Sequence, residues 1–322
     1  AVYAGEPRRL EIVSPDLRID ATPAFERPWR LRNVDVEAQV APDLHVLDIA
    51  RASFATGAAR IRASGRLSRV RDPARGELPL TAELVAELDG PVGKREVLDF
   101  WPVRLGDGAR RFLEEKVEAG RLLSARARLR LAPDSMAQGF LEDEALEVSF
   151  SVDEARVRPL HDIPPVEAAA GTGYLTGNSF RIDLDRGTYS SLSISGGEVD
   201  FPQLNPKGSD FHVTAHAAGP LVPAVKSIFA SRLQLEQATG FDPDRLSGNG
   251  RVTFELSRPA LERVPEGSLR FSVRGEVREA GLSEATAGLD LTDATARVDI
   301  DQERIVVTGF GQLGPATLNF DW

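Results

Sequence analysis

The chain has 322 residues, of which 42% are hydrophobic and 27% are charged, and this balance excludes bulk disorder. Its formal net charge of −10 argues against nucleic acid as the main partner, because binding to phosphates requires a basic surface. Since the chain has no cysteine, it cannot hold a disulfide framework, a thiolate metal site or a cysteine nucleophile.

Short segments in which apolar and polar residues alternate recur along the whole chain. Successive side chains of a strand point to opposite faces, so this period of two predicts strands with one apolar and one polar face. In 145–157, for example, residues 146, 148, 150 and 152 are Leu, Val, Phe and Val, and polar residues separate them. The pattern predicts strands at 8–13, 31–41, 44–56, 59–68, 78–88, 122–131, 145–157, 172–176, 179–184, 190–195, 211–217, 250–257, 268–275, 293–300, 303–309 and 316–320.

The links between these strands are short and rich in Gly, Pro, Asp and Asn, as in 89–91 and 247–250. Parallel neighbours would need crossovers of about a dozen residues. The short links therefore predict an antiparallel meander.

Two segments show helical spacing instead. In 107–120, Asp107 can cap a helix, apolar residues recur on one face, and Gly120 would end it. In 220–239, Pro220 suits a first helical turn. Both predicted helices are amphipathic, so they would cover an edge or end of the sheet, or line a groove.

The motifs that could carry chemistry are weak. The G-x-G-x-x-G match at 309–314 precedes Pro315 and an alternating segment rather than a helix, so its glycines are expected to bend a strand and not to bind a nucleotide. His212 and His216 fall on the polar face of a predicted strand, where a shared metal is not expected. We expect no catalytic residues, no metal site and no cofactor.

Two groups of charged residues leave alternatives open. Carboxylates at Asp183, Asp185, Asp299 and Asp301 could serve a carbohydrate-active enzyme only if they faced each other across a cleft, and solvated sheet faces explain them equally. The arginines at 126, 128 and 130 fit an edge strand that charge protects from aggregation, or a contact with anionic headgroups or an acidic partner.

The combined apolar face has two possible fates. Closed upon itself, it would form the core of a β-sandwich without a ligand. Left open as a trough, its aliphatic lining would suit lipid tails, because it offers apolar surface with few directional polar contacts. Composition alone does not choose between these.

One ordered pattern resembles a known family. Phe100-Trp101-Pro102 is followed by a segment with two arginines at 108–113 and by Val117-x-Ala119-Gly120 leading into a strand. This is similar to the conserved domain of YhdP-type members of the AsmA-like family. Weaker matches lie at 219–221, 240–248, 258–261, 280–282 and 309–314, so the resemblance extends from about Leu31 to the end of the chain.

The resemblance implies a long, twisted, taco-shaped β-sheet with an apolar groove. It also implies a periplasmic body that an N-terminal helix holds in the inner membrane of Gram-negative bacteria, and a part in phospholipid movement toward the outer membrane. No run of 18 apolar residues occurs here, and Met136 is the single methionine, so the anchor would lie outside this chain and residue 1 is not expected to be the native start.

We therefore predict a mainly β fold, an elongated, twisted antiparallel sheet with two short amphipathic helices. Residues 1–322 would form one continuous elongated β domain, with approximate modules at 1–100, 101–219 and 220–322. The expected function is non-enzymatic binding of phospholipid or another acyl-chain lipid; the alternatives are an envelope assembly factor with a closed core and, less favoured, a carbohydrate-active enzyme. The residues expected to line the groove are Val34, Val36, Leu84, Leu129, Val148, Phe150, Val152, Val252, Phe254, Leu269, Phe271 and Val298.

Overall fold

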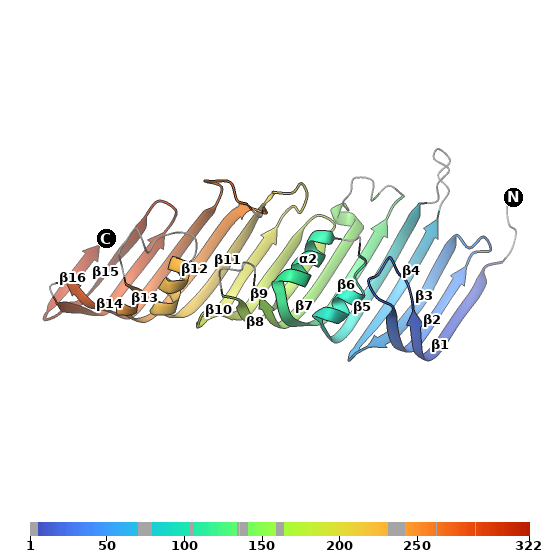
Figure 1. The fold of residues 1–322 in the computed structure, drawn as a ribbon, viewed down its shortest axis with the longest axis horizontal. Helices are drawn as coiled ribbons and strands as arrows, with labels where there is room; N and C mark the ends of the chain where they lie inside the picture. Colours follow the sequence, from blue (N-terminus) through green and yellow to red (C-terminus); the bar gives the residue numbers. More distant parts are fainter. Residues whose placement is uncertain are drawn as a thin grey trace. The chain divides into compact units, whose positions relative to one another are not determined.

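A computed structural model gives the structure of the chain and describes residues 6–322 apart from 70–78, 104–105, 134, 136–140, 159–163, 231–241, 262 and 287. The described residues form one antiparallel sheet of sixteen strands, in which the hydrogen-bonded order of the strands is their order in the sequence (Figure 1). The mainly β fold and the meander are thus confirmed. The strands are β1 (Arg8–Ile19), β2 (Trp29–Val40), β3 (Val46–Thr56), β4 (Ala59–Arg69), β5 (Leu80–Gly93), β6 (Val117–Leu131), β7 (Leu146–Val157), β8 (Val166–Thr176), β9 (Phe180–Tyr189), β10 (Leu192–Phe201), β11 (Asp210–Pro220), β12 (Leu246–Pro259), β13 (Arg270–Thr286), β14 (Leu289–Ile300), β15 (Ile305–Leu313) and β16 (Ala316–Asp321).

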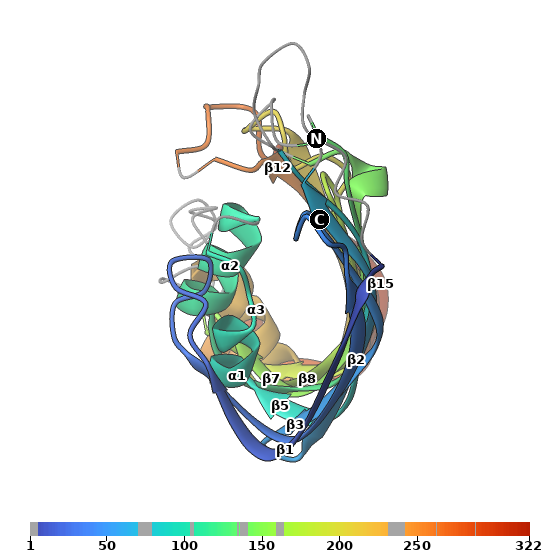
Figure 2. The same cartoon turned by 90° about the vertical axis from the view of Figure 1, so that its right-hand side faces the viewer.

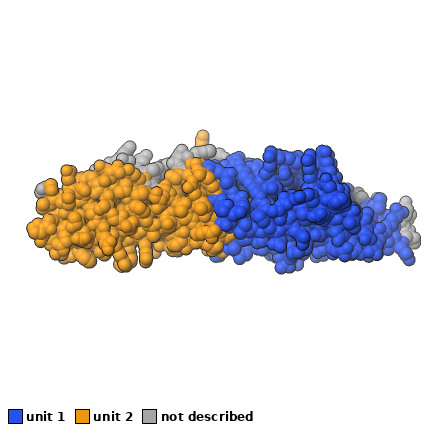
Figure 3. Space-filling view, turned by 90° about the horizontal axis from the view of Figure 1, so that it is seen from below, with its two compact units in different colours: residues 1–155, 172–181 blue, residues 156–171, 182–322 orange. Residues whose placement is uncertain are grey.

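The chain divides into two compact units, which Figure 3 shows in different colours. Unit 1 comprises residues 1–155 and 172–181, and unit 2 comprises 156–171 and 182–322. Unit 1 contains β1–β6, most of β7 and two of the helices, and unit 2 contains β10–β16 with the third, while β8 and β9 are divided between the units. The expected division into modules near residues 100 and 219 stays a prediction.

Three α-helices occur in the described residues, where two were predicted. The missed helix is α1 (Lys94–Asp99), and α2 (Asp107–Lys116) and α3 (Leu221–Ala230) correspond to the predicted pair. Single 3₁₀ turns, η1 (Asp143–Ala145) and η2 (Pro243–Arg245), precede β7 and β12. None of the described helices has the length and apolarity needed to cross a bilayer.

The predicted helix boundaries were partly wrong. Helix α2 begins at Asp107, after Gly106 with φ of 63°, and ends four residues before Gly120. Gly120 instead lies inside β6, where a Cβ would come within 3.1 Å of the Ala155 Cα in β7, so close strand packing explains this glycine better than a helix stop. Pro220 ends β11 and does not open a helix, and 231–239 lie outside the described residues.

The apolar face of the sheet carries helices and not a second sheet. In unit 2, Leu221 of α3 packs with Ala280 of β13 and Ala294 of β14. In unit 1, Phe100 at the end of α1 stacks on Phe54 of β3, with ring centroids 6.0 Å apart. Figure 2 shows α1 and α2 on the concave side of the bent strands of their unit. Since all sixteen strands belong to one sheet, the described residues do not form the closed β-sandwich that the sequence left open.

Burial agrees with an incompletely covered face. No large side chain among the described residues is less than 2% exposed, and the buried core is mostly alanine, valine and leucine. Most other apolar residues of the strands are only half-buried. The protein therefore leaves much of its apolar strand surface accessible, which a sealed core would not do.

Close strand packing at Gly65 gives a test of the sheet register. Gly65 in β4 has φ of 139°, and a Cβ there would lie 2.0 Å from the carbonyl oxygen of Glu83 in β5. We expect Gly65→Ala to lower the free energy of unfolding by about 1–3 kcal/mol. Gly108 in α2 has no such neighbour, so Gly108→Ala should raise that free energy by about 0.5–1 kcal/mol. Urea unfolding curves of the two variants and the parent measure both effects, and equal stability of the two variants would contradict this register.

Candidate functional site

The strand registers of unit 1 align apolar side chains into rows that cross the sheet. Each residue of a row lies directly opposite the next on the neighbouring strand, so all members share one face. One row contains Leu10, Ala38, Ile49, Gly65, Leu84 and Leu129. The next contains Ile12, Val36, Ala52, Ala63, Ala86 and Ala127. A third, from β3 to β6, contains Phe54, Ile61, Leu88 and Ala125.

These rows differ in side-chain size. From β3 to β6 every member of the middle row is alanine, and most members of the flanking rows are larger, with Gly65 and Ala125 as the exceptions. No charged residue interrupts any of the three rows. The apolar face of unit 1 is thus a continuous hydrocarbon surface, with a shallow depression along the row of alanines.

Strand β7 continues this face. On the polar side, Ser124 and Ser151 approach to 2.7 Å between their hydroxyl oxygens, and Arg128 Nη1 donates to Glu147 Oε2 at 3.3 Å. The residues that alternate with them, Val148, Phe150 and Val152, therefore lie on the apolar side. The Phe150 ring covers Gly173 of β8, where a Cβ would come within 2.1 Å of the ring, so any larger residue there would displace the ring.

Unit 2 has rows of the same kind. One contains Ala217, Val252, Gly275, Val298 and Val307; a second contains Ala215, Phe254, Val273, Ile300 and Ile305; a third contains Val213, Leu256 and Phe271. Phe271 and Val273 are 7% and 4% exposed, so these two rows are buried where they cross β13.

Eleven of the twelve residues predicted to line a groove lie in strands on this apolar face. The exception is Leu269, because β13 begins at Arg270 and not at 268 as predicted. Leu269 lies in the preceding loop, where its carbonyl accepts a hydrogen bond from Gln302 Nε2 at 3.3 Å. Contact of these residues with lipid stays a prediction. The alanines of the middle row were not among the predicted lining residues, since only the register reveals their alignment.

The predicted family motif at 100–102 forms a corner just after α1, and ring contacts and hydrogen bonds hold it in place. Phe100 contacts Trp29 and Phe54, and the Trp29 indole N–H donates to the Asp99 carbonyl at 2.9 Å. Trp101 contributes its carbonyl oxygen, which accepts a hydrogen bond from Arg110. After Pro102, the Val103 N–H donates to the Ala24 carbonyl at 3.0 Å.

Arg110 holds this corner together. It is 7% exposed, and its guanidinium donates to the Leu98 and Trp101 carbonyls at 3.1 and 3.0 Å. It also pairs with Glu26 at 2.6 Å and with Glu114 at 3.0 Å. We call this arrangement the Arg110 brace. It joins the β1–β2 connection, the end of α1 and the body of α2, and sequence patterns did not indicate it.

The opposite face of the sheet is polar and carries cross-strand ion pairs. Arg66 in β4 donates to Asp48 in β3, with Nη2 3.0 Å from Oδ2, and this hydrogen bond lowers the pKa of Asp48 below its ordinary value. The predicted edge-strand explanation of the arginine stripe was wrong. β6 lies between β5 and β7, where Arg126 faces Glu87 and Arg128 pairs with Glu147.

The residues of the other candidate sites, namely the histidines, the aspartate pairs and the glycine motif, do not come together in the structure. Within the described residues no cluster of His, Asp and Glu could hold a metal ion, and His216 Nδ1 lies 3.1 Å from the Thr253 hydroxyl. The two aspartate pairs belong to β9 and to the end of β14, five strand positions apart, or about 24 Å at the usual spacing. Gly309 and Gly311 lie in β15, packed against β14, so the 309–314 motif is a strand and turn.

The fold and the apolar face together define a class of protein. It is a β protein with a single sheet, in which an apolar surface extends across consecutive strands. The YhdP family model, described as YhdP protein, matches residues 4–321. The chain therefore belongs to the YhdP family, which is AsmA-like, and the predicted resemblance is confirmed. No curated protein and no solved structure matches the chain.

Proposed function

We propose that the chain binds acyl chains of phospholipids on its apolar face and contributes to their transport between the inner and outer membranes. The continuity of the apolar rows across β1–β6 carries this proposal. Membership of the YhdP family supports an AsmA-like lipid-transport role. A periplasmic location, with attachment to the inner membrane through a segment outside this chain, belongs to the same proposal.

The dimensions of the rows suit a lipid tail. Six strands at about 4.8 Å apart give a row of about 24 Å. The hydrocarbon part of one leaflet is about half of a 30 Å bilayer core, or about 15 Å. A single extended tail would therefore lie within unit 1 alone, along the alanine row.

The mechanism we propose is passive. Each methylene that stays out of water contributes about 0.8 kcal/mol, so a tail that moves along an unbroken row keeps this free energy at every step. The headgroup would remain in water outside the apolar face. Net movement would follow the difference in lipid chemical potential between the two ends and would use no catalytic residue.

Photo-crosslinking on two neighbouring residues tests the proposal. A photoreactive amino acid at Val148, on the apolar face, should crosslink to lipid in bacteria grown with radioactive phosphate, and the same substitution at Ser149, on the polar face, should not. Phe254 and Glu255 give a matched pair in unit 2. We expect the apolar-face positions to carry at least five times as much radioactive lipid as the polar-face positions. Equal label on both faces, or none on either, would overturn the proposal and favour a ligand-free scaffold of the envelope.

A further inference from the structure

A hollow on the polar face of unit 1 is not explained by lipid binding. Its volume is about 340 Å³, within the roughly 300–1,000 Å³ of small-molecule pockets. Nine of its lining residues have side chains of the polar alternation: Arg62, Glu87, Asp89, Ser124, Arg126, Ser149, Ser151, Thr172 and Tyr174. We call it the outer hollow, and we propose that it binds a neutral saccharide.

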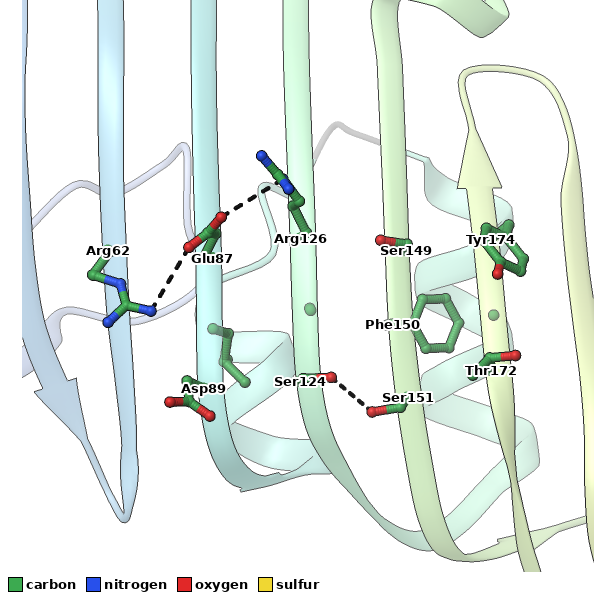
Figure 4. Close-up of a pocket in the computed structure, with 13 residues that line it drawn as sticks. Arg62, Glu87, Asp89, Ser124, Arg126, Ser149, Phe150, Ser151, Thr172 and Tyr174 are labelled. Atoms are coloured by element: carbon green, nitrogen blue, oxygen red, sulfur yellow. Dashed lines mark hydrogen bonds and ion pairs between the residues drawn. The ribbon is translucent and has the colours of Figure 1, made fainter.

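Short side chains create the outer hollow. Its floor consists of Ser124 on β6, Ser149 and Ser151 on β7, and Thr172 on β8, flanked by much longer side chains (Figure 4). The Ser124 and Ser151 hydroxyls lie 2.7 Å apart and hold each other in place. A hydroxyl both donates and accepts hydrogen bonds, so this floor matches the hydroxyl groups of a sugar ring.

An exposed aromatic ring borders the hollow on one side. Tyr174 is 50% exposed and lies across from Ser149 in Figure 4. Its ring offers a flat apolar surface beside a hydroxylated floor, and its own hydroxyl can donate or accept. This combination suits a pyranose, which has an apolar face of C–H groups and a polar rim.

The opposite side of the hollow is charged but can still form hydrogen bonds. Glu87 lies between Arg62 and Arg126, at 3.7 and 3.6 Å from their nitrogens. These distances permit ion pairing and exceed a normal hydrogen bond, so donors and acceptors remain for a ligand. Figure 4 shows the three side chains side by side, above Ser124 and Ser151 in that view.

The charges of the lining decide the class of ligand. Arg62 and Arg126 offset Glu87 and Asp89, so the hollow has no formal net charge and favours neither an anion nor a cation. A neutral ligand with many hydroxyl groups is the chemistry that remains.

Saturation-transfer NMR with chitotetraose and maltotetraose tests the proposal on the whole chain. Saturation of the sugar C–H protons is expected for at least one of them. Tyr174→Ala and Ser149→Leu, which would remove the ring and fill the floor, should weaken that binding fivefold or more. Phe310→Ala is the matched control, because Phe310 is 52% exposed on unit 2, and it should leave binding unchanged.

Circular dichroism melting curves would establish that all three variants are folded, as their exposed positions lead us to expect. Absence of binding by both sugars at millimolar concentration would overturn the proposal. Equal binding by the parent and Tyr174→Ala would do so as well, and so would displacement of the sugar by inorganic phosphate at equal concentration, which would indicate an anion site.

Discussion

Arg110→Ala should lower the free energy of unfolding by about 2–4 kcal/mol, the largest loss of stability that we expect from one substitution. The side chain is nearly buried and makes hydrogen bonds to two backbone carbonyls and ion pairs with two carboxylates. Its loss would leave the Leu98 and Trp101 carbonyls without these partners. Because Glu26 and Glu114 remain half-exposed, water can solvate them, and the loss should stay below that of a fully buried pair.

Urea unfolding followed by circular dichroism measures this loss, and two variants sharpen it. Arg111→Ala, on the exposed side of the same helix, should change stability by no more than about 0.5 kcal/mol. Arg110→Lys should recover only part of the loss, because one ammonium nitrogen cannot replace all three guanidinium nitrogens, of which Nη1 reaches both carbonyls and the other two reach Glu26 and Glu114. A stability for Arg110→Ala equal to that of Arg111→Ala would show that the Arg110 brace does not stabilise unit 1.

The positions of the strands could be predicted from the sequence, because the alternation of apolar and polar residues is a local property. The lengths of the strands could not be predicted, because bulges interrupt this alternation. The strand predicted at 268–275 extends to Thr286, and Glu279, with φ of 51°, shifts its register against β14. The strand predicted at 172–176 begins at Val166, beyond Ala168 with φ of 49°. One extra residue in a strand inverts the period of two, so the pattern stops at each bulge although the hydrogen bonds continue.

Helix α1 was missed for a different reason. It has six residues, too few for an apolar stripe to repeat, and it follows directly on β5. A local contact stabilises its first turn, since Glu96 accepts a hydrogen bond from the Gly93 N–H at 2.9 Å. A Glu three residues after a glycine is too common a pattern to mark a helix start by itself.

The candidate site was predictable in part. Alternation identified which residues share the apolar face, and eleven of the twelve lie on it. The register of the strands decides which of these residues lie side by side, and turns and bulges across the whole sheet determine that register. Arg110 and Glu26 are 84 positions apart in the sequence, so no local pattern joins them.

Ala86→Glu should slow lipid transfer by this chain at least tenfold. Ala86 lies in the middle of the alanine row, between Ala63 and Ala127, on a face that is only half-buried. A carboxylate there would be hydrated, so a passing tail would have to displace its water or leave the row. A cost of about 1.4 kcal/mol at this step is enough for a tenfold change, and desolvating a charge costs more than that.

The adjacent residue supplies the control. Val85 lies on the polar face of the same strand, opposite Arg128, so Val85→Glu adds the same charge one residue away without touching the row. Transfer of fluorescent phosphatidylethanolamine between vesicles, measured with both variants at equal concentration, compares them directly. Because Ala86 is not fully buried, Ala86→Glu should fold, with its melting temperature close to that of Val85→Glu. If both folded variants transferred lipid as fast as the parent, tails would not travel along the alanine row.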